Sequence, residues 1–481
     1  MRIPDNGLSR DEVLRRLESY RVKDLATKGG RTWAYVYDSG RAEVDAVAKQ
    51  AYMMYLSENA LDPTVYPSLL RLETELAAMA AAHLGGDGNT VGNFTSGGTE
   101  SCMLAVKTAR DLARAKRPEI KEPEMILPVT AHAAFHKAAH YFGVKKVITP
   151  VDPVTFKADV KAMEKAITPN TILLVASAVS YAHGVVDPIP ELGRVALRHD
   201  LLLHVDGCIG AFLLPYFRRL GAPVGDFDFS VPGVTSISMD WHKYAYCPKG
   251  ASIILYRNKA IRKHQFYACA EWTGYTVINS TIQSSKSGGP LAAAWAVLNF
   301  IGDDGYMEIA RRTYEATIKI IKGLEGIKEI RLLGRPELCL VAFTSDTVSV
   351  FHIIDEMKLK NWYIQPQLGY HDSKENIHLS ISTVSLDRVD EMLADLEDCV
   401  ARAKSLPFGQ AEAMTRQAFA DLDPNQLTDE TFKEMLGLAG IQGGELPQRM
   451  AEINEMLNAL PAKLRERLLI EFLNELFVYR S

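Results

Sequence analysis

Hydrophobic positions follow a helical period first and a strand-like pattern afterwards. Between about Pro67 and Gly85 apolar residues recur at helical spacing, which predicts a helix. The apolar runs that follow are short and typical of strands: Met125–Val129, Lys146–Thr149, Ile172–Ala176, Leu201–Val205, Ser236–Met239 and Ser252–Tyr256. Helical stretches such as Leu104–Ala115 and Glu191–His199 separate these runs. The alternation predicts an α/β domain with a mostly parallel sheet flanked by helices.

The pattern changes around Gly302–Gly305, where a smaller α+β C-terminal domain is predicted to begin. Its expected elements are a long helix over Tyr306–Leu324, strands near Arg331 and Leu340, a helix near Phe351, a strand at Ile377–Ile381 and a final helix. Beyond Pro407 the chain is helical again, with an apolar stripe formed by Leu464, Leu468, Phe472, Leu476 and Phe477. We expect this stripe to pack on its own subunit or on a partner. The expected segments are 1–66, a large domain at 67–302, the smaller domain at 303–404 and a helical extension at 405–481.

Composition and charge describe an ordinary globular protein. The chain carries 54 Lys and Arg against 59 Asp and Glu, and this formal charge of -5 gives no electrostatic reason to bind nucleic acid. The six cysteines form no CxxC pair, which suits a reducing compartment. The N-terminus lacks the apolar core of a signal peptide, and no apolar stretch is long enough to span a membrane. We therefore expect a cytoplasmic protein without an integral membrane segment.

The segment Ser236–Gly250 carries the most informative chemistry. A predicted strand ends just before His242 and Lys243, and a second strand follows. Ligands bind at the carboxyl ends of parallel strands, so this lysine is placed at a candidate site. Burial among aromatic residues could lower the pKa of Lys243 and free its amine for Schiff-base chemistry.

Two further features fit a pyridoxal-phosphate site around Lys243. Asp206 ends the apolar run Leu201–Val205, and a carboxylate there can pair with the pyridinium nitrogen, which makes the ring a better electron sink. The residues Asn93–Ser101 (NFTSGGTES) lead directly into a helix, and small residues at a helix N-terminus leave N–H groups free to bind a phosphate. Pyridoxal phosphate is therefore the predicted cofactor.

Other cofactor sites are disfavoured. The glycines of Gly86–Gly92 miss the dinucleotide-binding spacing by one residue and lack a preceding strand, and no Walker lysine is present. His132, His136 and His140 have helical spacing, but the glutamate of a zinc-protease motif is missing, so we predict no metal site. We expect His132 instead to open a helix at the end of Met125–Val129 and to face the cofactor.

Several spaced motifs resemble the sphingosine-1-phosphate lyase branch of the group II pyridoxal-phosphate decarboxylases. They are TSGGTES at 95–101, AHAAF at 131–135, HVDGCIGAF at 204–212, GVTSIS at 233–238, HKYAYCPKG at 242–250 and SGGPLAAAW at 287–295. The likeness runs in order from about residue 30 to about residue 400. It implies a fold type I enzyme that forms a homodimer with active sites at the subunit interface, the N-terminal segment 1–66 contributing to both.

The resemblance also implies roles for individual residues. Lys243 would bond covalently to the cofactor, Asp206 would pair with its ring nitrogen and His132 would stack on its ring. The phosphate would be bound by Gly97, Gly98, Thr99 and His242, with Ser285 or Gly288 reaching it from the other subunit. The positions that the family associates with substrate binding or with proton transfer are Tyr37, Asn59, Tyr181 and Lys249. In the family reaction a base removes the C3 hydroxyl proton of a phosphorylated 2-amino-3-hydroxy lipid, and the C2–C3 bond breaks in a retro-aldol step.

The expected substrate pocket departs from the family pattern. Asp62 stands where the family has a histidine that helps to bind the substrate phosphate, and a carboxylate there would repel a dianion. Tyr35 and Trp241 stand where the family has smaller residues. Three hypotheses follow: a carbon–carbon lyase of the sphingosine-1-phosphate lyase kind, an amino-acid α-decarboxylase with Asp62 facing an amine or hydroxyl, and a non-catalytic binder of the cofactor.

Overall fold

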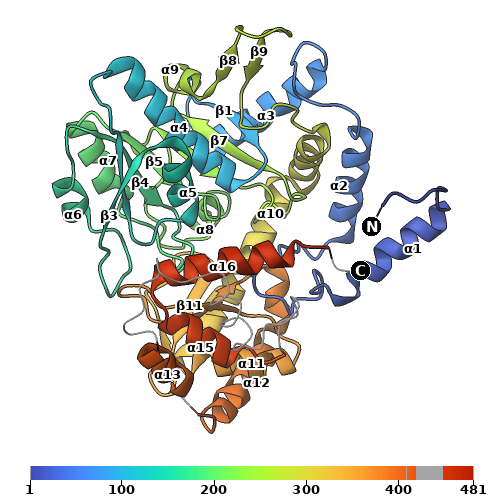
Figure 1. The fold of residues 1–481 in the computed structure, drawn as a ribbon, viewed down its shortest axis with the longest axis vertical. Helices are drawn as coiled ribbons and strands as arrows, with labels where there is room; N and C mark the ends of the chain where they lie inside the picture. Colours follow the sequence, from blue (N-terminus) through green and yellow to red (C-terminus); the bar gives the residue numbers. More distant parts are fainter. Residues whose placement is uncertain (1, 408, 419–447, 480–481) are drawn as a thin grey trace.

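The computed structural model describes residues 2–407, 409–418 and 448–479, which form two lobes (Figure 1). A seven-stranded sheet lies at the centre of the larger lobe, in the order β1-β7-β6-β5-β4-β2-β3. Its strands are β1 (Val91–Thr95), β2 (Glu124–Pro128), β3 (Lys145–Thr149), β4 (Thr171–Ser177), β5 (Leu202–Asp206), β6 (Ser236–Met239) and β7 (Ser252–Tyr256). Neighbours from β3 to β6 are parallel, whereas β7 runs antiparallel to β1 and β6. The predicted mostly parallel sheet is confirmed.

Helices cover both faces of this sheet, as its apolar strands require. Successive residues of β4 enter different cores: Leu173 and Val175 join one cluster, and Leu174 and Ala176 join the other. The helices of this lobe are α3 (Pro67–His83), α4 (Gly98–Lys116), α5 (Ala133–Phe142), α6 (Val160–Lys165), α7 (Ile189–Arg198), α8 (Leu214–Arg219) and α9 (Lys259–Arg262). A small hairpin of β8 (Tyr267–Cys269) and β9 (Val277–Asn279) extends from the top of the lobe in Figure 1.

The smaller lobe is built on an antiparallel four-stranded sheet in the order β10-β11-β13-β12. Its elements are β10 (Arg331–Leu332), β11 (Leu340–Thr344), α11 (Val350–Leu359), β12 (Gln365–Gln367), β13 (Asn376–Ser380) and α12 (Val389–Ala403). The predicted α+β architecture is therefore present.

One long helix, α10 (Gly288–Glu325), runs from the larger lobe into the smaller one (Figure 1). The sequence pattern predicted a helix only from Tyr306. The chain instead kinks at Gly302, whose φ of 64° favours glycine, and both halves remain helical.

The C-terminal extension packs on the smaller lobe. Its described helices are α13 (Gln410–Ala418), α15 (Ala451–Ala459) and α16 (Ala462–Leu476), and the backbone N–H groups of Met450 and Ala451 donate to Asp355. The apolar stripe predicted for the last helix is buried only in its first half. Leu464 and Leu468 are buried, whereas Phe477 is 85% exposed.

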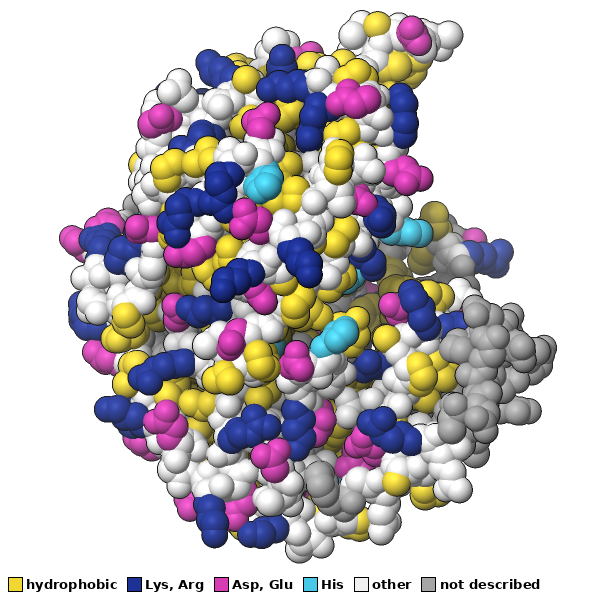
Figure 2. All heavy atoms as spheres, turned by 90° about the vertical axis from the view of Figure 1, so that its left-hand side faces the viewer, with side chains coloured by type: hydrophobic (Ala, Val, Ile, Leu, Met, Phe, Trp, Pro, Cys, Tyr) yellow, Lys and Arg dark blue, Asp and Glu magenta, His cyan; other side chains and the backbone are white. Residues whose placement is uncertain are grey.

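The N-terminal helices are α1 (Arg10–Tyr20), which buries none of its residues, and α2 (Ala42–Met54), which packs on α10. Basic and acidic side chains are interspersed over the face shown in Figure 2. Among the described helices, none is both long enough and apolar enough to cross a membrane.

Candidate active site

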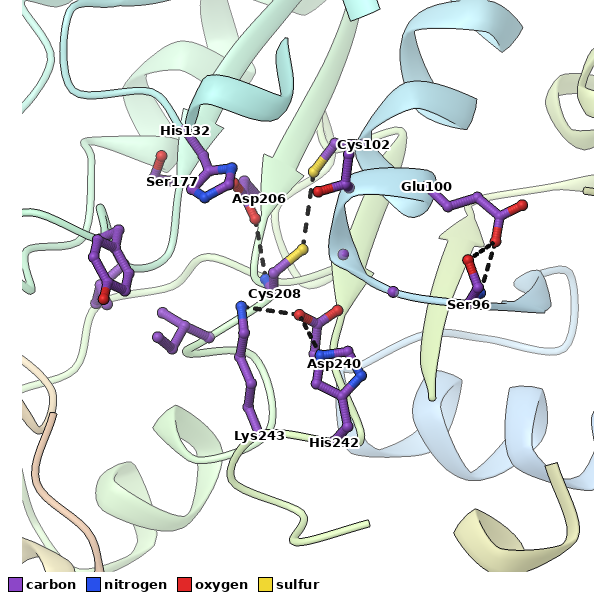
Figure 3. A pocket seen from close by; sticks show the side chains of 16 residues that line it. Ser96, Glu100, Cys102, His132, Ser177, Asp206, Cys208, Asp240, His242 and Lys243 are labelled. Atoms are coloured by element: carbon purple, nitrogen blue, oxygen red, sulfur yellow. Dashed lines mark hydrogen bonds and ion pairs between the residues drawn. The ribbon is translucent and has the colours of Figure 1, made fainter. Parts of the chain in front are cut away.

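Residues that follow the carboxyl ends of several strands line one cavity of about 420 Å³ (Figure 3). It brings together eight of the residues predicted from the sequence: Gly97, Gly98, Thr99, His132, Tyr181, Asp206, His242 and Lys243. They come from the loop after β1, the turn before α5, the segment after β4, the end of β5 and the loop after β6. The sheet therefore brings together site residues that are more than a hundred positions apart in the sequence.

The glycine loop before α4 forms one wall of the cavity and is called the phosphate cup here, residues 96–100. The helix begins at Gly98, so the first N–H groups of α4 are free of helical partners. Glu100 fixes the loop, since its carboxylate accepts hydrogen bonds from Ser96 N (2.6 Å) and from Ile282 N (2.9 Å). A Cβ at Gly98 would lie 2.7 Å from Asp240 Oδ2, so only glycine allows this close approach.

Asp206 ends β5, and two neighbouring donors hold its carboxylate in place. Its Oδ1 accepts hydrogen bonds from Cys208 N (3.1 Å) and Ser238 Oγ (3.4 Å). His204 lies behind Ser238, with 3.3 Å between its Nε2 and the Ser238 Oγ, and burial lowers the pKa of His204 to about 4. His204 is therefore neutral at neutral pH. Asp206, and not His204, is the ionisable residue of β5 that lines the cavity.

Lys243 follows β6 and forms an ion pair that the sequence did not predict. Its Nζ lies 2.9 Å from Oδ2 of Asp240, which is 2% exposed (Figure 3). Burial by itself would lower the pKa of Lys243, but the Asp240 carboxylate overrides burial and raises it. The expectation that burial frees the Lys243 amine is therefore wrong for this arrangement, in which the amine is an ammonium.

His132 and Tyr181 face the cavity from the opposite side. His132 is the N-cap of α5, where its Nδ1 accepts a hydrogen bond from Ala134 N (3.2 Å), as the sequence predicted for a residue that opens the helix. Its ring meets that of Tyr181 edge to face at 6.4 Å. The Tyr181 hydroxyl donates to Gln365 Oε1 (2.6 Å), and burial is the main cause that raises the pKa of Tyr181 to about 12.

Tyr37 and Lys249 lie next to Lys243 outside the cavity lining. The Lys249 Nζ sits 4.6 Å from the centre of the Tyr37 ring and donates to the carbonyl of His242 (3.3 Å). Lys249 is exposed as a residue, but desolvation of its amine, with the charge of Lys243, lowers the pKa of Lys249 to about 8. Burial raises the pKa of Tyr37. Two of the four positions predicted for substrate binding or proton transfer, Tyr37 and Lys249, thus form one cluster with Lys243.

Besides Tyr37 and Lys249, five predicted residues do not line the cavity of their own chain: Tyr35, Asn59, Asp62, Ser285 and Gly288. The segments that carry four of them meet, because Asn59 pairs with Ser287 in a β-bridge and Gly288 N donates to the carbonyl of Glu58 (2.9 Å). Tyr35 is 56% exposed and packs against Tyr363.

Trp241 also differs from its expected place. It is 1% exposed and packs on Phe212 in the core, so it adds no bulk to the cavity.

Sequence reasoning missed Asp240, Glu100 and a pair of thiols. Cys102 and Cys208 both line the cavity, and their Sγ atoms lie 3.8 Å apart without a disulfide. The sequence could have indicated Asp240, which lies between a predicted buried strand and the candidate lysine. A carboxylate buried there is costly unless a nearby group of opposite charge pairs with it. Glu100 gave a similar signal, three residues into a glycine-rich helix start.

The donor set fits a phosphorylated aldehyde cofactor. A buried amine, a carboxylate for a ring nitrogen, an aromatic ring and a glycine cradle for an anion surround one space. The buried Ser177 Oγ in its lining has no hydrogen-bond partner in the described part of the chain. These features define a pyridoxal-phosphate-dependent enzyme.

Comparisons with known proteins identify the family. A family model described as "Pyridoxal-dependent decarboxylase conserved domain" matches residues 40–346, and the chain belongs to this family. A second model, "Pyridoxal-dependent enzyme, C-terminal putative HTH domain", matches residues 413–475. The cofactor is therefore pyridoxal phosphate.

Three relatives place the chain within the family. It is 43% identical to a sphingosine-1-phosphate lyase of Oryza sativa subsp. japonica over 84% of this chain and 75% of the relative. A protein of Pyrococcus furiosus named "Probable L-aspartate decarboxylase" is 33% identical over 77% of this chain and 96% of that protein. The solved sphingosine-1-phosphate lyase of Burkholderia pseudomallei K96243 superposes with a TM-score of 0.80 at 34% identity, over 87% of this chain and 96% of that one. The chain is thus a sphingosine-1-phosphate-lyase-like enzyme of fold type I.

Proposed function

We propose that this enzyme cleaves the C2–C3 bond of a phosphorylated 2-amino-3-hydroxy substrate, with sphingosine-1-phosphate as the first compound to test. The observation that carries the proposal is the likeness to sphingosine-1-phosphate lyases over most of the chain. The site supports it, because the lyase reaction needs a proton acceptor near the reactive lysine and Lys249 occupies such a position.

Bound pyridoxal phosphate supplies an electron sink for the bond pair released at the substrate carbon. The protein's own part is to orient the substrate and to accept the proton of its C3 hydroxyl. Tyr37 and Tyr181 have raised pKa values, so they are hydroxyl donors near neutral pH. The Lys249 amine, with a pKa of about 8, is partly neutral there and is the better proton acceptor.

We propose further that the enzyme is a homodimer whose partner subunit completes each active site. Asn59, Asp62 and Ser285 do not line the cavity of their own chain, and in a symmetric dimer the same residues of the partner could complete it. Helix α1 buries no residue although Leu14 and Leu17 are apolar, and such a helix gains stability from a covering partner. Trp272 and Tyr275, in the loop between β8 and β9, are also exposed.

A cytoplasmic location is part of the proposal. All six cysteines are free thiols, including the Cys102 and Cys208 pair, and this supports a reducing compartment.

The alternative is an amino-acid α-decarboxylase, since the same site can release carbon dioxide when the carboxylate bond is aligned with the electron sink. The family model and the Pyrococcus furiosus relative favour it, and so does Asp62, whose hydrogen bonds from Thr64 lower the pKa of the carboxyl group and keep it ionised. A carboxylate at the substrate pocket suits an amine more than a phosphate.

One experiment separates the two functions. The enzyme is incubated with sphingosine-1-phosphate and, separately, with a panel of amino acids that includes aspartate, and both aldehyde and carbon dioxide are measured. Aldehyde release without carbon dioxide supports the lyase. Release of carbon dioxide from an amino acid, with no aldehyde from the phosphorylated lipid, would refute the lyase proposal and support the decarboxylase. The Lys243→Ala variant is the control and should turn over neither class.

A further inference from the structure

Asp240 borders two parts of the cofactor site at once. Its Oδ2 lies 2.9 Å from the Nζ of Lys243, the atom that must react with the cofactor aldehyde. A Cβ at Gly98 would lie 2.7 Å from the same oxygen, so Asp240 also touches the wall of the phosphate cup. Its other oxygen, Oδ1, is buried and has no hydrogen-bond partner among the described residues. One carboxylate therefore contacts the Lys243 amine and lies against the glycine wall of the cup.

The charges around Asp240 come from several elements. Its own loop contributes Lys243 and, at 3.5 Å, His242. The further titratable groups that feel its charge are Lys249, Tyr37, Cys102 and Cys208, and the Ser252 hydroxyl helps to lower its pKa. Asp206 acts on the same two thiols. The lysines are the stronger cations, because burial lowers the pKa of His242. Lys243, the cation in closest contact, holds the pKa of Asp240 below its usual value despite burial.

This arrangement creates a chemical problem. An ammonium has no lone pair, so Lys243 paired with an ionised Asp240 cannot attack an aldehyde. A phosphate dianion in the cup would also stand next to the Asp240 carboxylate, and like charges in a poorly solvated site repel strongly. Both difficulties disappear if the proton of Lys243 moves to Asp240.

We propose that Asp240 accepts the Lys243 proton when a phosphorylated aldehyde enters the cavity, and thereby couples phosphate binding to release of the reactive amine. The proton passes along the 2.9 Å contact, which leaves a neutral amine and a neutral carboxylic acid. The amine lone pair then attacks the aldehyde carbon, a carbon–nitrogen double bond forms, and the aldehyde oxygen leaves as one molecule of water. The protonated Asp240 can donate a hydrogen bond to the phosphate instead of repelling it. This step precedes any choice of substrate and is independent of the proposed function.

The test compares two aldehydes that differ in the phosphate. The full chain is freed of cofactor, and its reaction with pyridoxal phosphate or with pyridoxal is followed by absorbance between pH 6 and 9. Borohydride reduction and peptide mass then confirm Lys243 as the attachment site. For the unaltered protein we expect the pyridoxal rate to rise steeply with pH and the pyridoxal phosphate rate to change little. Equal pH slopes for the two aldehydes would overturn the proposal without any variant.

The Asp240→Asn variant provides the second arm. Without the carboxylate, burial lowers the pKa of Lys243, so we expect the pyridoxal rate at pH 7 to rise at least tenfold and the ratio of the two rates to fall by a similar factor. The matched control is Glu124→Gln, which changes a buried carboxylate that also pairs with a lysine, Lys145 Nζ at 2.8 Å, but does not line the cavity. Its pyridoxal rate should stay within twofold of the unaltered protein. An Asp240→Asn protein that folds, by circular dichroism, and keeps both rates would refute the role.

Discussion

The Lys249 amine lies 4.6 Å from the centre of the Tyr37 ring, within the same cluster as Lys243. Contact with an aromatic face stabilises the ammonium, but desolvation and the nearby charge of Lys243 outweigh it and lower the pKa of Lys249 to about 8. Lys249 is therefore the proposed proton acceptor, and its neutral form grows as the pH rises.

The first prediction concerns the pH dependence of this amine. Because the neutral form is the acceptor, kcat/KM should rise with pH and level off above about 8. The Lys249→Met variant should lose that rise and roughly 10²-fold or more of kcat, the usual size of a general-base contribution. Steady-state kinetics from pH 6 to 9.5 measure both. Lys249→Arg keeps the charge without an accessible neutral form, so it should behave like Lys249→Met, and a full rate in either variant would contradict the assignment.

The second prediction concerns the glycine of the phosphate cup. In Gly98→Ala the new Cβ would stand 2.7 Å from Asp240 Oδ2 and 2.8 Å from Cys208 Sγ. Such overpacking costs about 1–3 kcal/mol, so the affinity for pyridoxal phosphate should fall by roughly 5- to 150-fold. Titration of the cofactor absorbance measures this. Gly88→Ala is the matched control, since no described residue lies within 4 Å of the added Cβ, and a similar loss there would point to a general folding defect.

The sequence was sufficient for the residues whose surroundings are set by their own strand or helix. Lys243, Asp206, His132 and the glycines of the cup each follow a strand end, and a parallel sheet brings such ends together. The Lys243–Asp240 ion pair could not be predicted from the sequence, because the pKa of a lysine depends on the charged groups that the fold places around its amine.

The same limit explains the other differences. Trp241 could be placed next to His242 in the chain, but the direction of its side chain depends on the packing against Phe212. The kink at Gly302 was read as a boundary, since a glycine signal does not distinguish a bend from an end. Nor does a sequence say whether Asn59 serves its own cavity or a partner's.

The third prediction tests this division between subunits. If Asn59 serves the partner's site while Lys243 serves its own, a dimer of one Lys243→Ala and one Asn59→Ala subunit contains one intact site and one doubly altered site. Co-expression in equal amounts makes half of the dimers mixed, so about a quarter of the unaltered activity should return. Each variant alone should be nearly inactive. If both residues belonged to one chain's site, no mixed dimer would contain an intact site, and co-expression would restore nothing.

The fourth prediction concerns Asp62, which lies next to Asn59 on the exposed loop before α3. Its Oδ1 accepts hydrogen bonds from Thr64 N (2.8 Å) and Thr64 Oγ1 (2.6 Å), and these bonds lower the pKa of Asp62, so the group is negative at neutral pH. In Asp62→His the repulsion of a substrate phosphate disappears. The KM for sphingosine-1-phosphate should then fall roughly three- to tenfold with little change in kcat, because the change acts on binding away from the reacting bond.

A neutral control separates charge from loop structure. Asp62→Asn removes the charge and keeps an oxygen that can accept from Thr64, so it should give part of the fall in KM, and the effect should shrink at high salt because exposed charges are screened. Sphingosine without the phosphate, used as a competing ligand, should bind equally to all three proteins. An unchanged KM in both variants would mean that the substrate phosphate lies elsewhere, and a raised KM would mean that Asp62 supports a positively charged part of the substrate, as the decarboxylase alternative requires.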